Sequence, residues 1–258
     1  MTARQSAPEV TDDAALGGRL RLLQPRRGHR FGHDGVLLAA AAPAAAGDHV
    51  VDLGAGVGLA GLAVAVRVPQ VTVTLVERDP DLAALAAENI RRNRLEARAR
   101  AVLLDVSAPA RAWSAAALGP GSAQGVIMNP PFNDPARQNV SPDPARARAH
   151  AAAGGLEAWC RAARRLLAPD GVLTLIWRAE ALEHVLAALS RGFGAVSVLP
   201  VHPRPDAAAI RVLVSARKGS RGPLRMLPGL VLSDSEGRPT AAAEAVLRGA
   251  GSLALALP

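Results

Sequence analysis

Aromatic side chains are scarce in this chain: they make up 2% of its 258 residues, and tyrosine is absent. Hydrophobic residues still form half of the sequence, so a sizeable core must be built from alanine, valine and leucine. The single cysteine, Cys160, excludes an internal disulfide and a cysteine-based zinc cluster. Cys160 falls in a predicted helix over 156–167, and we interpret it as a core residue rather than a nucleophile.

Long apolar segments are also missing. The apolar run over 36–46 is too short and too rich in alanine to cross a bilayer, which needs about 20 apolar residues. Residues 1–13 are polar and lack the apolar region of a signal peptide. We therefore predict a cytoplasmic protein without a membrane partner.

Lysine is nearly absent, because Lys218 is the only one among 30 basic residues, yet the formal net charge is +8. A basic surface favours a polyanionic partner such as RNA, DNA or an acidic membrane. The alternative is arginine scattered over a protein that has no such partner. The charge favours nucleic acid over that alternative.

Short apolar runs alternate with helical patterns from residue 49 onward. This alternation predicts an α/β fold, with a mostly parallel sheet and helices on both faces. Ligands of such sheets bind at the carboxyl ends of the strands. The predicted strands are 49–53, 71–76, 101–104, 125–128 and 172–177, followed by a hairpin-like pair at 195–199 and 209–216. The predicted helices are 59–67, 81–93, 156–167 and 181–190.

The ends of the chain flank this pattern. We predict a flexible tail over 1–18, a main domain over 19–218 and a C-terminal extension over 219–258 that packs on or near the domain. Residues 20–23 suggest a short hairpin or extended lead-in, and Asp34 is expected to cap a helix over 35–42.

The extension carries an apolar run at 230–232 and a predicted helix over 240–248.

A glycine turn follows the first predicted strand and opens a helix. Asp52 precedes Gly54, Gly56 and Gly58, and such glycines permit a tight turn close to a ligand. Glu77 ends the second strand, where its carboxylate can accept hydrogen bonds from both hydroxyls of a ribose. Asp105 ends the third strand and can accept from an adenine amino group. These groups fit a cofactor that contains adenosine.

A dinucleotide site is the alternative for the same turn. Residues 56–61 match the dinucleotide glycine pattern, and Glu77 lies at the expected spacing of about 20 residues. However, the turn begins at Gly54, and counted from there the third glycine position is Leu59. Asp52 before the turn also favours a methyltransferase. A glycine turn that binds nothing remains a further alternative.

The sequence Asn129-Pro130-Pro131-Phe132 follows the fourth predicted strand directly. Its prolines stiffen the turn, and neither donates a backbone hydrogen bond. The side-chain oxygen of Asn129 and the carbonyl of Pro130 can then accept both hydrogens of a planar NH₂ group, while Phe132 offers a face for the attached ring. An ordinary proline-rich turn is the alternative, but its position at a strand end favours a ligand site.

Two acceptors of this kind suit methyl transfer to a conjugated nitrogen. The lone pair of such a nitrogen is delocalised. Holding both hydrogens out of plane favours a tetrahedral nitrogen whose lone pair is directed at the methyl group of the donor. A sulfonium is already activated, so orientation supplies most of the effect, and well-placed reactants can gain about 7–11 kcal/mol. No metal and no strong general base are required.

The glycine turn, Glu77, Asp105 and the Asn129 turn together resemble those of class I methyltransferases of the amino-group branch. The lead-in over 30–38 is similar to the segment before the cofactor domain in bacterial valine-tRNA N6-adenine methyltransferases. The resemblance extends over most of residues 20–216. It implies a Rossmann-like fold with a seven-stranded, mostly parallel sheet, S-adenosylmethionine as cofactor, S-adenosylhomocysteine as product and no metal.

The resemblance also implies site residues. Asp34 and its neighbours would close over the methionine end of the cofactor. His33 stands where a small hydroxylated residue is expected, and we favour a helix-flanking role for it. Phe132 stands where many relatives carry tyrosine, which keeps stacking but removes a hydroxyl contact. The implied cofactor-binding residues are Phe31, Asp34, Asp52, Gly54, Gly56, Gly58, Glu77, Arg78, Asp105, Val106 and Asn129; the implied catalytic residues are Asn129, Pro130, Pro131 and Phe132.

Two basic segments are candidates for substrate contacts. Arg137, Arg146 and Arg148 lie in a long, proline-rich stretch over 133–155, and contacts of these arginines with phosphate would make binding depend on salt. A second basic run comprises Arg204, Arg211, Arg217, Lys218, Arg221 and Arg225. A solvated surface is the alternative for both segments.

We therefore expect methylation of the exocyclic amino group of an adenine in tRNA, and the adenine must be unstacked to reach Phe132. Three alternatives stay open: methylation of a protein glutamine amide, methylation of a guanine amino group in rRNA, and a non-catalytic RNA-binding module. The oligomeric state is not predicted.

Overall fold

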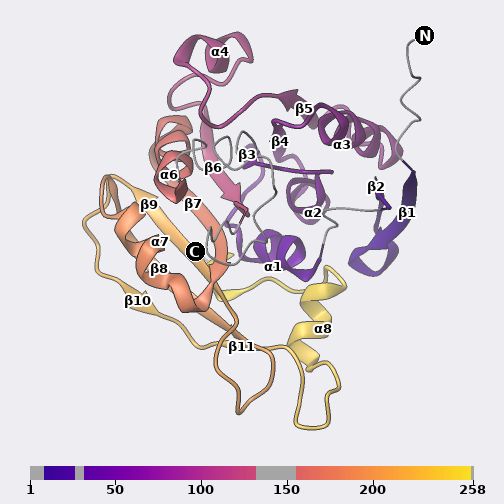
Figure 1. Cartoon of the computed structure of the whole chain (residues 1–258), viewed down its shortest axis with the longest axis vertical. Coiled ribbons are helices and arrows are strands. Elements are labelled where there is room, and N and C mark those ends of the chain that lie inside the picture. Colours follow the sequence, from indigo (N-terminus) through magenta and orange to yellow (C-terminus); the bar gives the residue numbers. More distant parts are fainter. Residues whose placement is uncertain (1–8, 27–31, 132–154, 257–258) are drawn as a thin grey trace, which may run out of the picture.

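The structure is a computed structural model that describes residues 9–26, 32–131 and 155–256 (Figure 1). Its central sheet has the strand order β5-β4-β3-β6-β7-β9-β8. Neighbouring strands from β5 to β7 are parallel, whereas β9 runs antiparallel to both β7 and β8. The strands are β3 (His49–Leu53), β4 (Thr72–Glu77), β5 (Ala99–Leu103), β6 (Ala123–Met128), β7 (Leu167–Arg178), β8 (Phe193–His202) and β9 (Arg211–Lys218).

This sheet confirms the predicted α/β fold. Every strand that the apolar runs predicted between 49 and 216 is present, although several ends differ by a few residues. The inner strands are buried on both faces, which is why they appear in the sequence as continuous apolar runs.

Helices cover both faces of the sheet (Figure 1). Each face has its own apolar core built mainly from leucine, valine and alanine, as the composition predicted. The first face carries α1 (His33–Ala41), α2 (Leu59–Arg67) and α3 (Pro80–Arg92); the second carries α4 (Ala110–Ala115), α6 (Gly155–Leu166) and α7 (Leu182–Leu189). Short 3₁₀ turns lie at Leu16–Gly18, Ala179–Ala181 and Ala254–Ala256.

Two side chains of the second face bear on the sequence predictions. Trp113 is 2% exposed and anchors α4, a six-residue helix that has no clear apolar period and was not predicted. Cys160 is buried in α6, and burial, helped by the nearby charge of Glu157, raises the pKa of its thiol to about 12. A thiol in that state is a poor nucleophile, so Cys160 is the core residue that we predicted.

The flexible tail predicted over 1–18 is wrong for its second half. Strand β1 (Val10–Ala15) pairs antiparallel with β2 (Leu20–Pro25) and forms a hairpin beside α3 (Figure 1). Residues 1–8 lie outside the described part. Asp12 and Asp13 interrupt the apolar alternation of β1, and the strand is largely exposed, so its order comes from pairing with β2 rather than from a local pattern.

Asp34 does not cap a helix, contrary to the prediction. Helix α1 begins at His33, its N-cap is Gly32, and no side chain among the described residues caps it. The Oδ2 atom of Asp34 instead accepts a hydrogen bond from Nε of Arg211, at 3.0 Å. This ion pair joins α1 to the start of β9 across 177 positions of sequence.

The C-terminal extension adds two short strands beside β8. Both β10 (Arg225–Met226) and β11 (Leu230–Val231) pair with β8 in parallel. Helix α8 (Ala241–Leu247) contacts α1, and Oγ1 of Thr240 caps it by accepting from the Ala243 amide at 3.1 Å. Among the described residues, no helix is both long and apolar enough to cross a membrane.

The hairpin makes a prediction about stability. Leu22 of β2 is fully buried, and its strand packs on α2 and α3. Replacing Leu22→Ala should lower the free energy of unfolding by about 2–5 kcal/mol, the usual cost of a large cavity. Urea denaturation measures this change. Leu103→Ala is the control, because Leu103 is 58% exposed, and its effect should stay within about 0.5 kcal/mol. An unchanged midpoint for Leu22→Ala would show that the hairpin is loosely attached.

Candidate functional site

The predicted site residues meet at the carboxyl edge of the sheet. Leu53 pairs with Val76 on one side and with Met128 on the other. The next residues along the three strands are therefore Gly54, Glu77 and Asn129, side by side at the edge. Asp105 follows two residues beyond the end of β5. The sheet register thus brings together groups that lie up to 75 positions apart in the sequence.

The glycine turn needs its glycines for two reasons. Gly54, Gly56 and Gly58 have φ values of +69°, +56° and +95°, a region that costs other residues about 1–2 kcal/mol. A Cβ atom on Gly54 would also lie 2.5 Å from the Trp159 ring, and one on Gly58 would lie 2.8 Å from the Leu75 side chain. Both Gly54 and Gly58 are therefore required by conformation and by space.

The Glu77 carboxylate holds this turn in place. Its Oε2 accepts from the Gly56 amide at 2.8 Å. Its Oε1 accepts from the amides of Arg78 and Asp79, at 2.8 and 2.9 Å. A carboxylate has about four lone-pair positions, so one is left for a further donor. The sequence predicted that Glu77 accepts hydrogen bonds from two ribose hydroxyls. The second hydroxyl would have to displace one of the three backbone amides that already bind Glu77.

Asp52 faces into the protein. It is 2% exposed, and its Oδ2 accepts from the Gly61 amide of α2 at 2.8 Å. Burial raises the pKa of Asp52 to about 7; the Gly61 hydrogen bond opposes this shift, and the charge of Glu77 adds to it. Asp52 therefore connects β3 to α2, and its direct contact with a cofactor stays a prediction.

Asp105 lies in the loop after β5 and is partly exposed. Its Oδ1 accepts from the amide and the hydroxyl of Ser107, at 2.7 and 2.6 Å. Its Oδ2 lies 3.9 Å from Nη1 of Arg78, so the loops after β4 and β5 meet here. Val106 beside it is half-buried. These positions suit the predicted adenine end of a cofactor, a role that stays a prediction.

The turn after β6 is described up to Pro131. Asn129 is half-buried, Pro130 is buried and Pro131 is exposed. Asn129 directly adjoins Gly54, as the hypothesis of a shared site requires. Phe132, Phe31, Arg137, Arg146 and Arg148 lie outside the described residues, and their predicted roles stay predictions.

The second basic run is not one patch. Arg211 begins β9 at the carboxyl edge, whereas Arg217 and Lys218 end β9 about 20 Å away, because each strand residue adds about 3.3 Å. At that far end the side chains of Arg217 and Lys218 donate to the carbonyls of Asp170 and Leu167. The prediction treated neighbours in sequence as neighbours in space, and an extended strand separates them.

Arg178 is a basic residue at the carboxyl edge that our prediction missed. It ends β7 and pairs in register with Arg211, and its Nη1 lies 3.2 Å from Oε1 of Glu180. Its position directly after the predicted buried strand 172–177 is the signal that could have revealed it.

The chain is similar to known proteins that are described as methyltransferases. The family described as "Methyltransferase small domain" matches residues 31–203. A curated relative from Shewanella halifaxensis, named tRNA1(Val) (adenine(37)-N6)-methyltransferase, is 32% identical over 159 residues, which is 61% of each chain. A protein of the same name from Dickeya chrysanthemi is 26% identical over 258 residues, covering 96% of this chain and 98% of its own. The chain thus matches about three fifths of the Shewanella relative at the higher identity.

Solved structures show the same architecture. A predicted O-methyltransferase from Agrobacterium tumefaciens is 30% identical, with a TM-score of 0.73 over 85% of this chain and 98% of its own. A T. thermophilus 16S rRNA N2 methyltransferase, solved with AdoMet and guanosine, has a TM-score of 0.59 and 20% identity over 84% of this chain and 52% of its own. The second likeness concerns the fold alone.

The buried Asp52 predicts a pH dependence of stability. A carboxyl whose pKa is raised from 3.8 to about 7 on folding binds its proton more tightly in the folded state. The contribution of this carboxyl to the free energy of unfolding is therefore complete below about pH 4 and is lost as the pH rises to about 7. The Asp52→Asn variant lacks this loss. Its free energy of unfolding, relative to the unmodified protein, should rise across this interval by up to about 4 kcal/mol. Urea denaturation at several pH values, without cofactor, measures the difference, and a flat difference would contradict the buried carboxyl.

Proposed function

The chain belongs to the methyltransferase small domain family, and we propose that it transfers a methyl group from S-adenosylmethionine to the exocyclic amino group of an adenine in tRNA. The observation that carries this proposal is the position of Asn129 and Pro130, directly after β6 and beside the glycine turn. The shared name of the curated relatives supports adenine in tRNA as the substrate.

The residues present fit S-adenosylmethionine. At Gly56 nothing lies within 4 Å of the place of a Cβ atom, so a ligand can approach the backbone of the turn closely there. Glu77 retains one acceptor position for a ribose hydroxyl, and Oδ2 of Asp105 can accept from an adenine amino group. When bound, S-adenosylmethionine supplies an activated methyl group on its sulfonium.

The Asn129 turn then orients the acceptor nitrogen. The side-chain oxygen of Asn129 and the Pro130 carbonyl each accept one hydrogen of the amino group, which leaves the nitrogen lone pair directed at the edge where Gly54 lies. Orientation of this kind accounts for most of the expected acceleration. The surplus proton leaves to water after transfer. A hydroxyl carries a single hydrogen and cannot use two acceptors, so the turn favours nitrogen despite the O-methyltransferase name of the Agrobacterium structure. A reaction without a metal remains a prediction.

Basic residues around the turn support an RNA substrate. Arg178 and Arg211 end and begin neighbouring strands at the same edge, and Arg204 is exposed in the loop between β8 and β9. Contacts between these side chains and phosphate would make binding weaken with salt. A cytoplasmic location, where tRNA is found, is part of the proposal.

Nucleoside analysis tests the proposal. Bulk tRNA is incubated with the protein and isotopically labelled S-adenosylmethionine, digested and analysed by mass spectrometry. The label should appear in N6-methyladenosine. Label in N2-methylguanosine from rRNA, or in a protein glutamine, would replace the proposal with one of those activities. Cofactor binding with no label in any substrate would indicate a binding module.

Asn129 gives the matching prediction for a variant. Asn129→Ala should leave the Kd for S-adenosylmethionine within about threefold and lower kcat by about 10²–10³-fold, as does the loss of one oriented group in other enzymes. Calorimetry and single-turnover methylation measure the two quantities. Asn93→Ala, an asparagine away from the carboxyl edge, is the control for kcat. An unchanged kcat for Asn129→Ala would contradict its role.

A further inference from the structure

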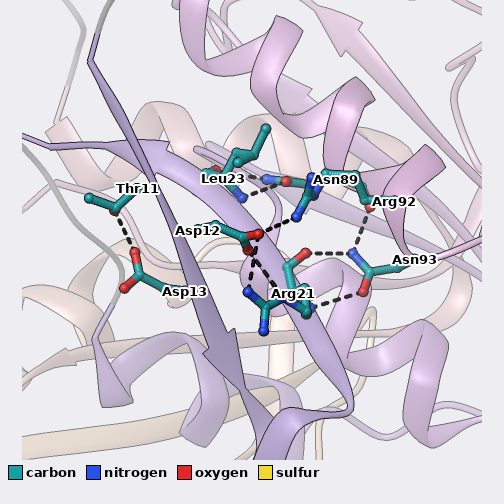
Figure 2. Close-up of polar contacts among 8 residues, drawn as sticks. All are labelled: Thr11, Asp12, Asp13, Arg21, Leu23, Asn89, Arg92 and Asn93. Carbon is teal, nitrogen blue, oxygen red and sulfur yellow. Dashed lines mark hydrogen bonds and ion pairs between the residues drawn. The ribbon is translucent and has the colours of Figure 1, made fainter.

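Asn89 in α3 and Asn93, the C-cap residue of α3, take the place of a second partner strand for β2 (Figure 2). One edge of β2 pairs with β1, and the other faces α3. Asn89 accepts from the Leu23 amide at 2.7 Å and donates to the Leu23 carbonyl at 3.0 Å. Asn93 makes the same pair of bonds with the backbone of Arg21, at 3.0 and 2.8 Å. The backbone groups of Arg21 and Leu23 on this second edge of β2 are thereby hydrogen-bonded.

The spacing of the two asparagines explains how a helix can do this. Residues four apart on a helix lie on one face and are separated by about 6 Å along the axis. Residues two apart on a strand point the same way and are separated by about 6.7 Å. Asn89 and Asn93 are therefore spaced to reach Leu23 and Arg21, respectively. Their four hydrogen bonds dock the hairpin on α3.

Salt bridges add little to this docking. Oδ2 of Asp12 in β1 lies 3.1 Å from Nη2 of Arg21 and 2.5 Å from Nη2 of Arg92. Figure 2 draws both contacts. The neighbouring arginines lower the pKa of Asp12. All three side chains are at least partly exposed, and exposed ion pairs are screened by water and salt.

Asn89 differs from Asn93 in one contact. Its Nδ2 also donates to the carbonyl of Val57, at 3.0 Å, whereas Nδ2 of Asn93 donates to the backbone of Asn89. Val57 lies between Gly56 and Gly58 in the glycine turn. Asn89 is fully buried, and both of its donor hydrogens are used. Of the two, Asn89 alone connects the hairpin to the turn.

Side chains thus hold two adjacent residues of the turn, in addition to its backbone hydrogen bonds. Glu77 binds the Gly56 amide, and Asn89 binds the Val57 carbonyl. The glycines on either side of Val57 have positive φ, and glycine restricts the backbone less than other residues do. Any loss of the binding-competent conformation lowers the apparent affinity for a ligand in proportion.

We propose that Asn89 is a positioning residue for the cofactor: it fixes Val57 and keeps the glycine turn in its binding conformation, so cofactor affinity depends on the bonds of Asn89 and not on the docking of the whole hairpin. The proposal rests on the proposed function, because it takes S-adenosylmethionine as the ligand of the turn. It gives the hairpin a part in binding only through the Leu23 backbone, which holds the Asn89 side chain.

Binding of S-adenosylhomocysteine, measured by calorimetry, tests the proposal on three proteins. Asn89→Ala should raise Kd by about tenfold, the ratio that corresponds to about 1.4 kcal/mol and to the loss of a good hydrogen bond. Asn93→Ala, which loosens the hairpin without touching the turn, should stay within about twofold. The kcat of Asn89→Ala at saturating cofactor should also stay within about twofold, which a general loss of folding would not allow.

The opposing outcomes are distinct. Equal affinity of Asn89→Ala and the unmodified protein would overturn the proposal, and so would an equal loss in both variants, since hairpin docking alone would then explain the effect. Failure of the unmodified protein to bind S-adenosylhomocysteine would overturn the proposed function before any variant is compared.

Hydrogen exchange on the unmodified protein decides the question if Asn89→Ala does not fold. Coupling between two sites is reciprocal, so cofactor binding at the turn must tighten the hydrogen bonds that Asn89 makes. Saturating S-adenosylhomocysteine should slow exchange of the Leu23 amide, held by Asn89, several times more than that of the Arg21 amide, held by Asn93. Equal slowing, or no slowing at Leu23, would overturn the proposal.

Discussion

The carboxylate of Glu77 is the constraint on which the carboxyl edge of this protein depends. It is nearly buried and accepts three backbone amides, one from the glycine turn and two from the loop that opens α3. A buried charge is costly unless it is hydrogen-bonded, and here the bonds come from two separate loops. The two loops are therefore fixed relative to each other before any ligand binds. The side chain of Asn89 holds the turn one residue further along, at the Val57 carbonyl.

Much of this arrangement could be predicted, because parallel strands are buried and end at the same edge. Continuous apolar runs revealed β3 to β7, and the residues after them revealed Gly54, Glu77 and Asn129 as neighbours. Contacts between distant segments could not be predicted in the same way. The pairing of Asp34 with Arg211, the order of β1 despite Asp12 and Asp13, and the bonds of Asn89 all depend on tertiary packing. The prediction of a single basic patch was wrong because β9 places Arg211 and Lys218 at opposite ends of the strands, although they are close in sequence.

The proposed chemistry divides between the two halves of the edge. Residues after β3, β4 and β5 form the side that suits an adenosine, and the turn after β6 presents the acceptors that suit an amino group. Beyond that turn, Arg178 and Arg211 lie on β7 and β9, where a nucleic acid larger than one nucleotide would continue. The Asp34–Arg211 ion pair joins this basic side to α1, so the two halves share a connection through the lead-in.

A crystal structure with S-adenosylhomocysteine and adenosine would test the central claim most directly. The account predicts the adenine amino nitrogen within about 2.7–3.2 Å of both the Asn129 side-chain oxygen and the Pro130 carbonyl. It also predicts that a ribose hydroxyl of S-adenosylhomocysteine donates a hydrogen bond to the Glu77 carboxylate. An amino group held elsewhere, or a cofactor that avoids the edge between Gly54 and Glu77, would contradict it.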